Sequence, residues 1–491
     1  MQYNNLRSGE TLHPDSSAKP LESTSGGEDR DVHFHRAYIF AIALTAAMGG
    51  LMFGYDWVVI GGAELFYEKY FHLVSALDVG WAMSSALIGA LTGALFAGTA
   101  SDKLGRKPLL IAAGLLFVVT SIGTGLAQNF PFFVVNRLLG GVAIGIASNI
   151  SPLYIAEVAP ASMRGRLVAV NQLTIALGVM LAQIVNWLIA QPTPVGTGVD
   201  QLPFDSWNVQ MAWRWMFRVT AAPAAVFFGA MFLVPESPRW LVKKGRVQEA
   251  LRVLARIGGA VYAERSIQDI EATLLSGIDR IDWREFFAPR MLKTLFLGIV
   301  IAVFQQWCGI NVIYQYGSRI FADAGYAVSG IMFSIVITGV VGLLMTLVAI
   351  ATVDRWGRRV LMLSGALGLT VMYLATGWVY NEHIKGILPV VLVVAAIACY
   401  CYSLAPITWV ILAEIFPNRV RGGAMSVSVV ALWSANFVLS QTFPVMYEKL
   451  GLARCFWIYA GICLAGFLFA FFNLPETKGK TLEQIERQLV D

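Results

Sequence analysis

Charge is scarce in this sequence of 491 residues, of which 14% are Asp, Glu, Lys or Arg and 57% are hydrophobic. An average soluble domain carries about a quarter charged residues, so the composition excludes an ordinary water-soluble protein. The excess of 36 Lys and Arg over 31 Asp and Glu is small, and the basic residues sit in short loops. We therefore expect no nucleic-acid partner and favour a polytopic membrane protein.

Cysteine and histidine are also rare, with five of each. His33 and His35 lie close together but lack further ligands nearby, so we expect no metal site. The sequence has no nucleotide-binding fingerprint after a strand and no grouping of nucleophile, base and metal ligands, so we expect neither an enzyme nor a cofactor. The cysteines fall in or beside apolar stretches without metal-ligand or disulfide spacing: Cys308, Cys399, Cys401, Cys455 and Cys463.

Long apolar windows dominate what remains. A helix that crosses the hydrocarbon needs about 20 apolar residues, and the sequence offers about twelve such windows. The first six lie near residues 37–60, 79–100, 108–127, 131–151, 167–190 and 213–234. Six more lie near 293–316, 328–352, 360–380, 386–412, 423–444 and 453–473. The windows predict an all-α membrane protein with twelve transmembrane helices.

Three polar segments frame two apolar bundles, 37–234 and 293–474. Residues 1–36 are rich in Ser, Gly and charge and lack the apolar stretch of a secretory signal, so they predict a disordered cytoplasmic tail. Residues 235–292 carry apolar residues at helical spacing, which predicts a cytoplasmic linker of short amphipathic helices. Packing and gating are equally open roles for this linker. Residues 475–491 are expected to form a second cytoplasmic tail.

Basic residues follow the even-numbered windows, as at Lys103, Arg106 and Lys107. The alternate loops are poorer in them, and residues 191–212 contain no Lys or Arg. Because basic loops favour the cytoplasmic side, we expect an even number of spans with both termini in the cytoplasm. The protein is expected to be a monomer in the plasma membrane, which in a bacterium is the cytoplasmic membrane.

Short motifs recur in the same order in the two bundles. GTASDKLGRK at 98–107 resembles IATVDRWGRR at 350–359, AEVAPASMRG at 156–165 resembles AEIFPNRVRG at 413–422, and PESPRW at 235–240 resembles PETKGK at 475–480. This order indicates a duplicated six-helix unit. Repeats of this kind place a substrate site near the midplane, where the two halves meet.

These motifs, with PLYIAEVAP at 152–160 and QQWCGIN at 305–311, resemble those of the sugar porter family of the major facilitator superfamily. The resemblance covers residues 37–487 and extends to bacterial proton-coupled xylose and hexose symporters and to facilitative glucose transporters. It implies the major facilitator fold, in which two six-helix halves rock about a central site.

Charged residues lie at the expected cytoplasmic ends of the helices in both halves. Opposite charges at helix ends can bridge neighbours in one conformation and separate in another, and the resemblance implies that they close the cytoplasmic side in the outward-open state. Alternatively, the positive charges serve topology alone, and both roles can hold. The expected network comprises Asp102, Arg106, Glu157, Arg164, Glu236, Arg239, Asp354, Arg358, Glu414, Arg421 and Glu476.

Polar residues inside the windows are costly unless they face a cavity or a partner. Amides donate and accept hydrogen bonds, which suits a neutral, polyhydroxylated ligand, and an indole can cover the apolar face of a pyranose. For a single Gln, hydrogen bonding between helices is the alternative. The resemblance assigns sugar binding to Gln172, Gln305, Gln306, Asn311 and Trp409, with Phe53 and Trp433 as apolar walls.

Five positions depart from the pattern of the family. Gln315 replaces a frequent Tyr, Leu432 a frequent Gln or Asn, Ala405 a Gly, Gly342 an Asn and Thr220 a Glu. The wall that the C-terminal half contributes to the site is thus less polar than in well-known hexose and xylose carriers. The sequence therefore does not specify which sugar is bound.

Asp56 lies within the first window, in LMFGYDWVVIGG, where a carboxylate is costly, and Arg137 of the fourth window is its expected partner. The resemblance implies that proton-driven members keep an Asp here, whereas many passive carriers have Asn. We predict a proton-coupled symporter of a small neutral monosaccharide, hexose or pentose, that works by alternating access. A passive uniporter, a sugar sensor and a permanent Asp56–Arg137 bridge remain open as alternatives.

Overall fold

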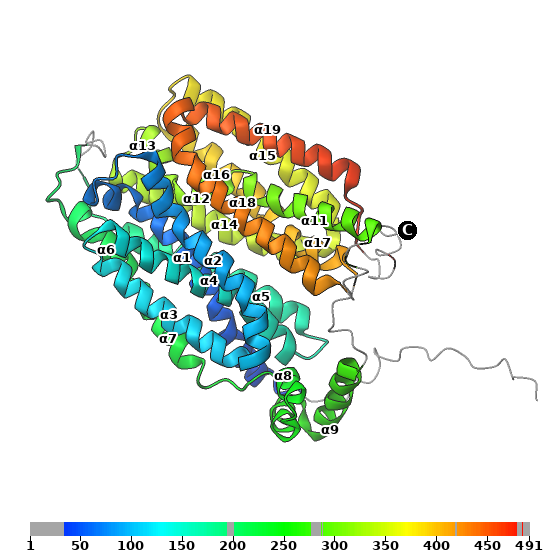
Figure 1. Ribbon diagram of the computed structural model, residues 1–491. Coiled ribbons are helices and arrows are strands. Elements are labelled where there is room, and N and C mark those ends of the chain that lie inside the picture. The colour runs from blue at the N-terminus through cyan, green and yellow to red at the C-terminus, as the bar shows by residue number, and fades with distance from the viewer. Residues whose placement is uncertain are drawn as a thin grey trace, which may run out of the picture.

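The computed structural model describes residues 34–193, 201–275, 286, 288–417, 420–478 and 484. The tails expected at 1–36 and 475–491 lie mostly outside these residues. Most of the described chain is helical, and the long helices of the bundle run roughly along one common axis, which α9 does not share (Figure 1). The predicted all-α membrane fold is confirmed.

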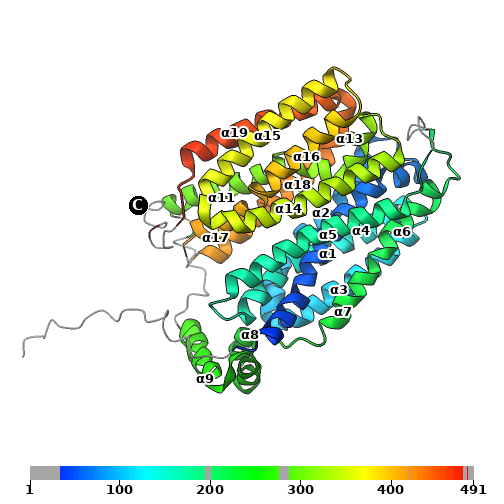
Figure 2. The ribbon, with the colours of Figure 1, turned by 180° about the vertical axis from the view of Figure 1, so that it is seen from behind.

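The N-terminal half consists of helices α1 to α7 (Figure 1). Their bounds are α1 Arg36–Tyr70, α2 Ala76–Leu104, α3 Arg106–Leu126, α4 Phe130–Val158, α5 Arg164–Ile189, the π-helix η3 Asn208–Ala212, α6 Trp213–Val219 and α7 Ala221–Ala230. Two helices of the linker follow, α8 Pro238–Lys243 and α9 Val247–Leu275. Both lie at one end of the bundle, which we call the linker end (Figure 2).

The C-terminal half consists of helices α11 to α19. Their bounds are α11 Pro289–Trp307, α12 Ile310–Gln315, α13 Gly317–Asp323, α14 Val328–Trp356, α15 Arg358–Asn381, α16 Ile387–Cys401, α17 Leu404–Ile415, α18 Arg421–Leu450 and α19 Leu452–Asn473. The halves meet where α2 packs against α18 and α5 packs against α14.

Eleven helical stretches of the described chain are long and apolar enough to cross a membrane. The window predicted at 213–234 is not among them, because it is divided into α6 and α7. Pro223 has no N–H to bond the carbonyl of Val219, which explains a break at Thr220. The twelve predicted spans are thus present as eleven long stretches and one broken helix.

Two of those eleven stretches are also interrupted, although the sequence predicts continuous helices there. Gly309 adopts a left-handed conformation with φ +85° between α11 and α12, which glycine adopts without steric cost. Pro406 cannot bond the carbonyl of Tyr402, and α16 ends beside that residue. Discontinuous helices leave polar backbone groups at membrane depth, which is tolerated where they line a cavity or are buried in protein.

The first helix extends ten residues beyond the end of the window predicted at 37–60, since α1 continues to Tyr70. Glu64 and Glu68 lie in this extension, and their charge ended the apolar window in the sequence. The helix continues because both carboxylates are paired with an arginine across the interface between the halves.

Glycines allow α2 and α4 to approach until their backbones touch. A Cβ atom at Gly89 would collide with the carbonyl oxygen of Leu138, and one at Gly141 would collide with that of Ala86. Small residues at such spacings hold membrane helices together by close packing. The spacings of Gly89 and Gly93 on α2, and of Gly141 and Gly145 on α4, indicate close packing of each helix, and the structure shows that the two helices meet.

The buried apolar residues form two separate clusters, one toward the linker end and one toward the opposite end. On α1, Met52 belongs to the first cluster and Val59 to the second, and Asp56 lies between them. On α11, Gln305 and Gln306 likewise lie between Ala302 and Cys308. These polar residues therefore lie near the boundary of the two clusters, next to Tyr55 and Phe304 of the second one, and we call this level the polar layer.

Candidate transport site

Asp56 and Arg137 form a buried ion pair in this polar layer. Arg137 Nη1 lies 3.0 Å from Asp56 Oδ1 and 3.1 Å from Oδ2, and both side chains are almost fully buried. The Arg137 guanidinium also lies 5.4 Å from the centre of the Phe217 ring. Its Nε has no hydrogen-bond partner among the described residues. The pair joins α1 to α4 within the N-terminal half.

Thr220 supplies no second carboxylate to this pair. It is fully buried at the break between α6 and α7, and its hydroxyl donates to the carbonyl of Met216 in its own helix. Among the described residues, the pair therefore consists of one carboxylate and one guanidinium.

The amides on the broken helix α11–α12 form a continuous chain of hydrogen bonds. Asn311 Nδ2 donates to Gln306 Oε1, and Gln306 Nε2 donates to Gln305 Oε1. Gln305 Nε2 in turn donates to the hydroxyl of Tyr400, at 2.6 Å. Tyr400 is a residue that sequence reasoning missed, since a tyrosine in an apolar window gives no distinct signal.

Gln172 on α5 and Trp409 on α17 do not belong to this chain. Gln172 is half-buried, and Trp409 is 37% exposed and lies in neither apolar cluster. No hydrogen bond of either side chain is found within the described residues. Their amide and indole groups are therefore available to a ligand.

The two expected apolar walls meet across the interface between the halves. Phe53 of α1 and Trp433 of α18 have ring centres 6.0 Å apart. Trp57, which the sequence analysis did not single out, lies 5.8 Å from Trp433 and 6.0 Å from Phe53. These rings flank Asp56 on α1, so they connect the N-terminal ion pair to the C-terminal half.

The residues that depart from the family pattern are either apolar or bonded to other residues of the protein, so they offer few polar groups to a ligand. Gln315 is buried and accepts a hydrogen bond from Ser440 of α18, and Leu432 belongs to the apolar core. A Cβ atom at Gly342 would lie 3.1 Å from the hydroxyl of Tyr314. The tyrosine hydroxyl therefore occupies space that a larger side chain at this position would need. Ala405 is half-buried on α17.

The charge network of the N-terminal half is assembled at the linker end. Arg106 makes two hydrogen bonds of 2.9 Å to Glu157 and one of 3.2 Å to Asp102. Glu236 accepts the backbone N–H groups of Arg106 and Lys107, at 3.1 and 3.2 Å. Burial raises the pKa of Glu236, and backbone N–H bonds from Ser237, Lys107 and Arg106 oppose this effect.

The C-terminal half repeats the arrangement. Arg358 pairs with Glu414 at 3.1 Å, and Glu476 accepts the N–H groups of Arg358 and Arg359 at 3.0 and 3.1 Å. Thr477 donates to Glu414 at 2.6 Å. These pairs lie within one half, so they stabilise each half rather than the contact between halves.

The remaining network residues are arranged differently. Arg164 is exposed at the start of α5, and Arg239 is half-buried in α8. Arg421 donates from Nε to the carbonyl of Phe416, at 3.2 Å. The side chain of Asp354 lies outside the described part of the structure.

The opposite end of the bundle is closed between the halves. Ser318 of α13 donates to the carbonyl of Gly61 on α1 at 2.6 Å, and Ser84 of α2 donates to Gln441 of α18 at 2.6 Å. Gln183 of α5 donates to Thr338 of α14 at 3.1 Å. Glu64 and Glu68 also reach Arg319 of α13 at this end, and no motif in the sequence marks these carboxylates as functional.

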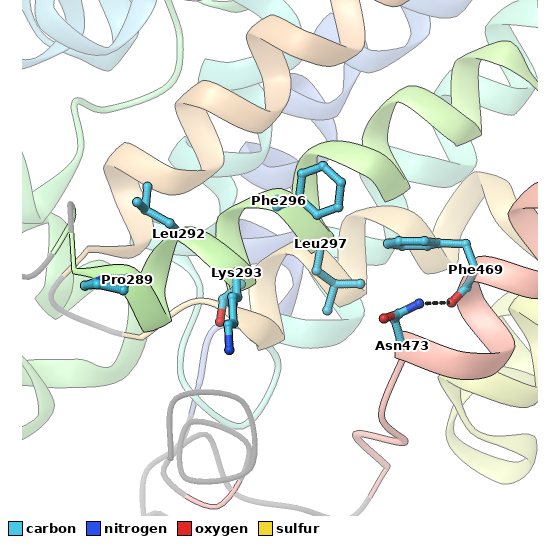
Figure 3. Close-up of a pocket in the computed structure, with 8 residues that line it drawn as sticks. Pro289, Leu292, Lys293, Phe296, Leu297, Phe469 and Asn473 are labelled. Atoms are coloured by element: carbon cyan, nitrogen blue, oxygen red, sulfur yellow. Dashed lines mark hydrogen bonds between the residues drawn. The ribbon is translucent and has the colours of Figure 1, made fainter.

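A separate hollow of about 460 Å³ lies between α11 and α19 (Figure 3). It is lined by Pro289, Leu292, Lys293, Thr294, Phe296, Leu297, Phe469 and Asn473. None of the expected sugar-binding residues lines it, so we assign it no part in transport.

Comparison with known proteins identifies the family of this chain. Residues 42–489 match the family described as "Sugar (and other) transporter". The arabinose-proton symporter of Bacillus subtilis (strain 168) is 36% identical over 452 residues, covering 92% of this chain and 95% of the relative. The D-xylose-proton symporter of Escherichia coli (strain K12) is 34% identical over 487 residues, covering 93% and 96%.

A solved structure also matches closely. The inward open conformation of the xylose transporter from Escherichia coli superposes with a TM-score of 0.81 at 34% identity, covering 92% of this chain and all of that one. Family match, sequence identity and shared fold agree over nearly the whole chain. The protein therefore belongs to the sugar porter family of the major facilitator superfamily.

Proposed function

We propose that this protein is a proton-coupled monosaccharide symporter that works by alternating access. The observation that carries the proposal is the buried Asp56–Arg137 pair, located in the polar layer near the boundary of the two apolar clusters. A membrane-buried carboxylate needs a partner or a proton, and this one has a single arginine. The proton-symporting relatives with arabinose and xylose support the same reading.

The sugar-binding residues in this proposal are Gln172, Gln305, Gln306, Asn311 and Trp409. An amide carries two N–H donors and two oxygen lone pairs, so Gln306 retains a donor and an acceptor beside its contacts with Gln305 and Asn311. Trp409 offers a ring face and an N–H. Phe53 and Trp433 exclude water from the apolar face of the sugar.

The proton site in this proposal is Asp56, and Arg137 controls its charge. Contact with the guanidinium favours the ionised carboxylate. When the cavity closes around sugar and the pair separates, the carboxylate is left in an apolar environment and takes up a proton. Sugar and proton then cross together. A charged carboxylate is unstable when the closed protein surrounds it, and so are the amides when no sugar satisfies their hydrogen bonds.

We place the linker end in the cytoplasm, with both termini on that side of the plasma membrane. The basic loops after α2, α4 and α14 support this orientation. The hydrogen bonds between halves at the opposite end, and the similarity to an inward open structure, support an inward-facing state. In the alternate state, the charges at the linker end hold that end closed. We expect the monomer to be the working unit.

A passive uniporter is the second candidate, because the same fold and amide site would serve facilitated diffusion. The ionisable Asp56 beside Arg137 favours coupling, since a neutral residue would suffice for a uniporter. A sugar sensor would bind without transporting.

The deciding experiment is uptake by the purified protein in proteoliposomes. A panel of labelled pentoses and hexoses is offered with and without an inward pH gradient, with an ionophore as control. We expect accumulation above the external concentration only with the gradient. Uptake that merely equilibrates under both conditions would establish the uniporter, and binding without uptake would establish the sensor.

A further inference from the structure

A buried group of charges connects the two halves at the opposite end of the bundle. Arg319 Nε of α13 lies 3.2 Å from Glu64 Oε1 of α1, and Arg319 Nη2 lies 2.7 Å from Glu68 Oε2. The side chain of Glu64 is fully buried, and that of Glu68 is 14% exposed. Glu64 and Glu68 lie beyond Asp56 on α1, and the transport mechanism above uses neither them nor Arg319.

Neighbouring contacts show that the three charges lie on a tight interface. Ser318, next to Arg319, donates to the carbonyl of Gly61, and a Cβ atom at Gly61 would collide with the carbonyl oxygen of Tyr314. The Arg319 guanidinium lies 5.4 Å from the centre of the Tyr447 ring on α18. Parting the halves at this end must therefore break both ion pairs of Arg319.

The charges in this group do not balance. Two carboxylates face one guanidinium, and both oxygens of Glu64 and Oε1 of Glu68 have no hydrogen-bond donor among the described residues. A buried, unpaired carboxylate is strongly disfavoured, and two like charges in contact disfavour the ionisation of one of them. One proton shared by Glu64 and Glu68 would remove the excess charge and supply the missing donor.

Other titratable groups nearby do not correct the imbalance. The groups that face the two carboxylates or Arg319 are Tyr67 of α1, Tyr316 before α13, Tyr447 of α18, Asp323 at the end of α13 and, beyond Tyr67, Arg137 of α4. Tyrosines are neutral near pH 7. Asp323 is exposed and accepts from Tyr447, and Arg137 is paired with Asp56.

We propose that Glu64, Glu68 and Arg319 form an ionic gate that closes this end of the transporter and takes up one proton as it closes. The proton comes from the solvent that reaches Glu64 and Glu68 when the halves are apart, and it binds a carboxylate oxygen to give a neutral carboxyl. That carboxyl donates its hydrogen to the other carboxylate, which remains paired with Arg319. That this end faces the outside of the cell rests on the proposed function, whereas the gate itself does not.

The sign of the pH dependence follows from this uptake. If the closed state binds one proton more than the open state, the ratio of closed to open molecules falls by up to about tenfold for each pH unit of increase, until neither state binds the proton. Lower pH therefore favours closure of this end, even without sugar.

The test measures the distance across this end by double electron-electron resonance. Spin labels are placed at Val74 and Ile387, which are 94% and 74% exposed, in protein with Cys399→Ser and Asp56→Asn. The second substitution removes the pH response of Asp56. We expect the short distance to lose population as pH rises. Glu64→Gln, which balances the charges without a proton, should abolish this response and keep the short distance at every pH.

Three further variants complete the test. Arg319→Gln should deplete the short distance, and Arg319→Lys should restore part of it. Glu448→Gln removes an exposed carboxylate of α18 and should leave the pH response unchanged. Size-exclusion chromatography and thermal unfolding establish that each variant is folded.

The proposal is overturned if the distances in the parent protein do not change with pH. It is also overturned if the full response persists in both Glu64→Gln and Glu68→Gln, or if Arg319→Gln leaves the short distance intact. Because these measurements need no sugar, a failure of gradient-driven uptake in proteoliposomes would count against symport and not against the gate.

Discussion

At the scale of single residues, the cost of charge in the membrane restricts what each polar group can do. Asp56 and Arg137 are only 4% and 2% exposed, so water cannot stabilise either one alone. Removing one partner of such a buried pair typically costs about 3–5 kcal/mol. A conformational change that separates the two must therefore bring in a proton, a ligand or water.

Asp56→Asn should abolish uphill uptake while retaining sugar binding and exchange. Asn has nearly the same shape but cannot be ionised, so the change removes the proton site and leaves the amide layer intact. The measurement is accumulation in proteoliposomes under a pH gradient, with counterflow exchange as the second readout. Asp78→Asn, at an exposed carboxylate of α2, is the matched control. Undiminished accumulation by a folded Asp56→Asn protein would rule out this proton site.

Gln306→Ala should weaken sugar binding while leaving the fold intact. Gln306 is the central member of the chain from Asn311 to Tyr400, and losing one good hydrogen-bond partner in a buried site costs about 1–3 kcal/mol. We expect the Kd measured by calorimetry to rise about 5- to 150-fold. Asn136→Ala is the control, since within the described part of the chain the Asn136 amide bonds to Phe132 of its own helix and to no other residue. Equal affinities for the two variants would place the sugar elsewhere.

The sequence identifies some of these functional residues better than others. Asp56 and Arg137 stood out because each is a lone charge in an apolar window, and the structure brings them into contact. Tyr400 and Trp57 could not be recognised, since aromatic residues are ordinary in apolar windows and only the three-dimensional arrangement shows that they touch Gln305 and Trp433. Glu64 and Glu68 fell beyond the predicted end of the first window.

At the scale of elements, the sequence predicts where helices cross the membrane better than where they break. Hydropathy averages over about 20 residues, so one proline or one left-handed glycine hardly changes it. The interruptions beside Gly309 and Pro406 nevertheless adjoin the amide chain and Trp409. The local causes were visible in the sequence, but a proline inside a membrane helix does not by itself decide between a kink and a full break.

Gly309→Ala should disturb the junction of α11 and α12. An alanine at φ +85° costs about 1–2 kcal/mol, and its Cβ would lie 2.6 Å from the Tyr459 ring. We expect a lower melting temperature and weaker sugar binding, because Asn311 lies only two residues further along the chain. Gly317→Ala is the control, since its Cβ would meet only Ile335, at 3.7 Å. If both variants behave alike, the left-handed turn has no special importance for the site.

At the scale of the whole molecule, one sequence must support at least two arrangements of its halves. The state described here has hydrogen bonds and ion pairs between halves at the opposite end. The named pairs at the linker end lie within single halves. No feature of the sequence could predict which state is observed, because the same charges serve both. What the sequence does predict is a set of charged residues that we expect to change partners.

Arg164 is such a residue, and its replacement should shift the balance between states. It is exposed in the state described here, so Arg164→Gln costs this state little. The alternate state would lose a bridge between halves at the linker end, worth about 0.2–1 kcal/mol for a partly exposed pair. We therefore expect the population of the state described here to rise by about 1.4- to 5-fold relative to the alternate one.

Spin labels at Leu104 and Val360, both exposed, report the distance across the linker end. Lys103→Gln removes another exposed charge at the linker end, at the end of α2, and should not shift the distances. An equal shift in both variants would mean that Arg164 contributes only general positive charge and determines topology rather than conformation.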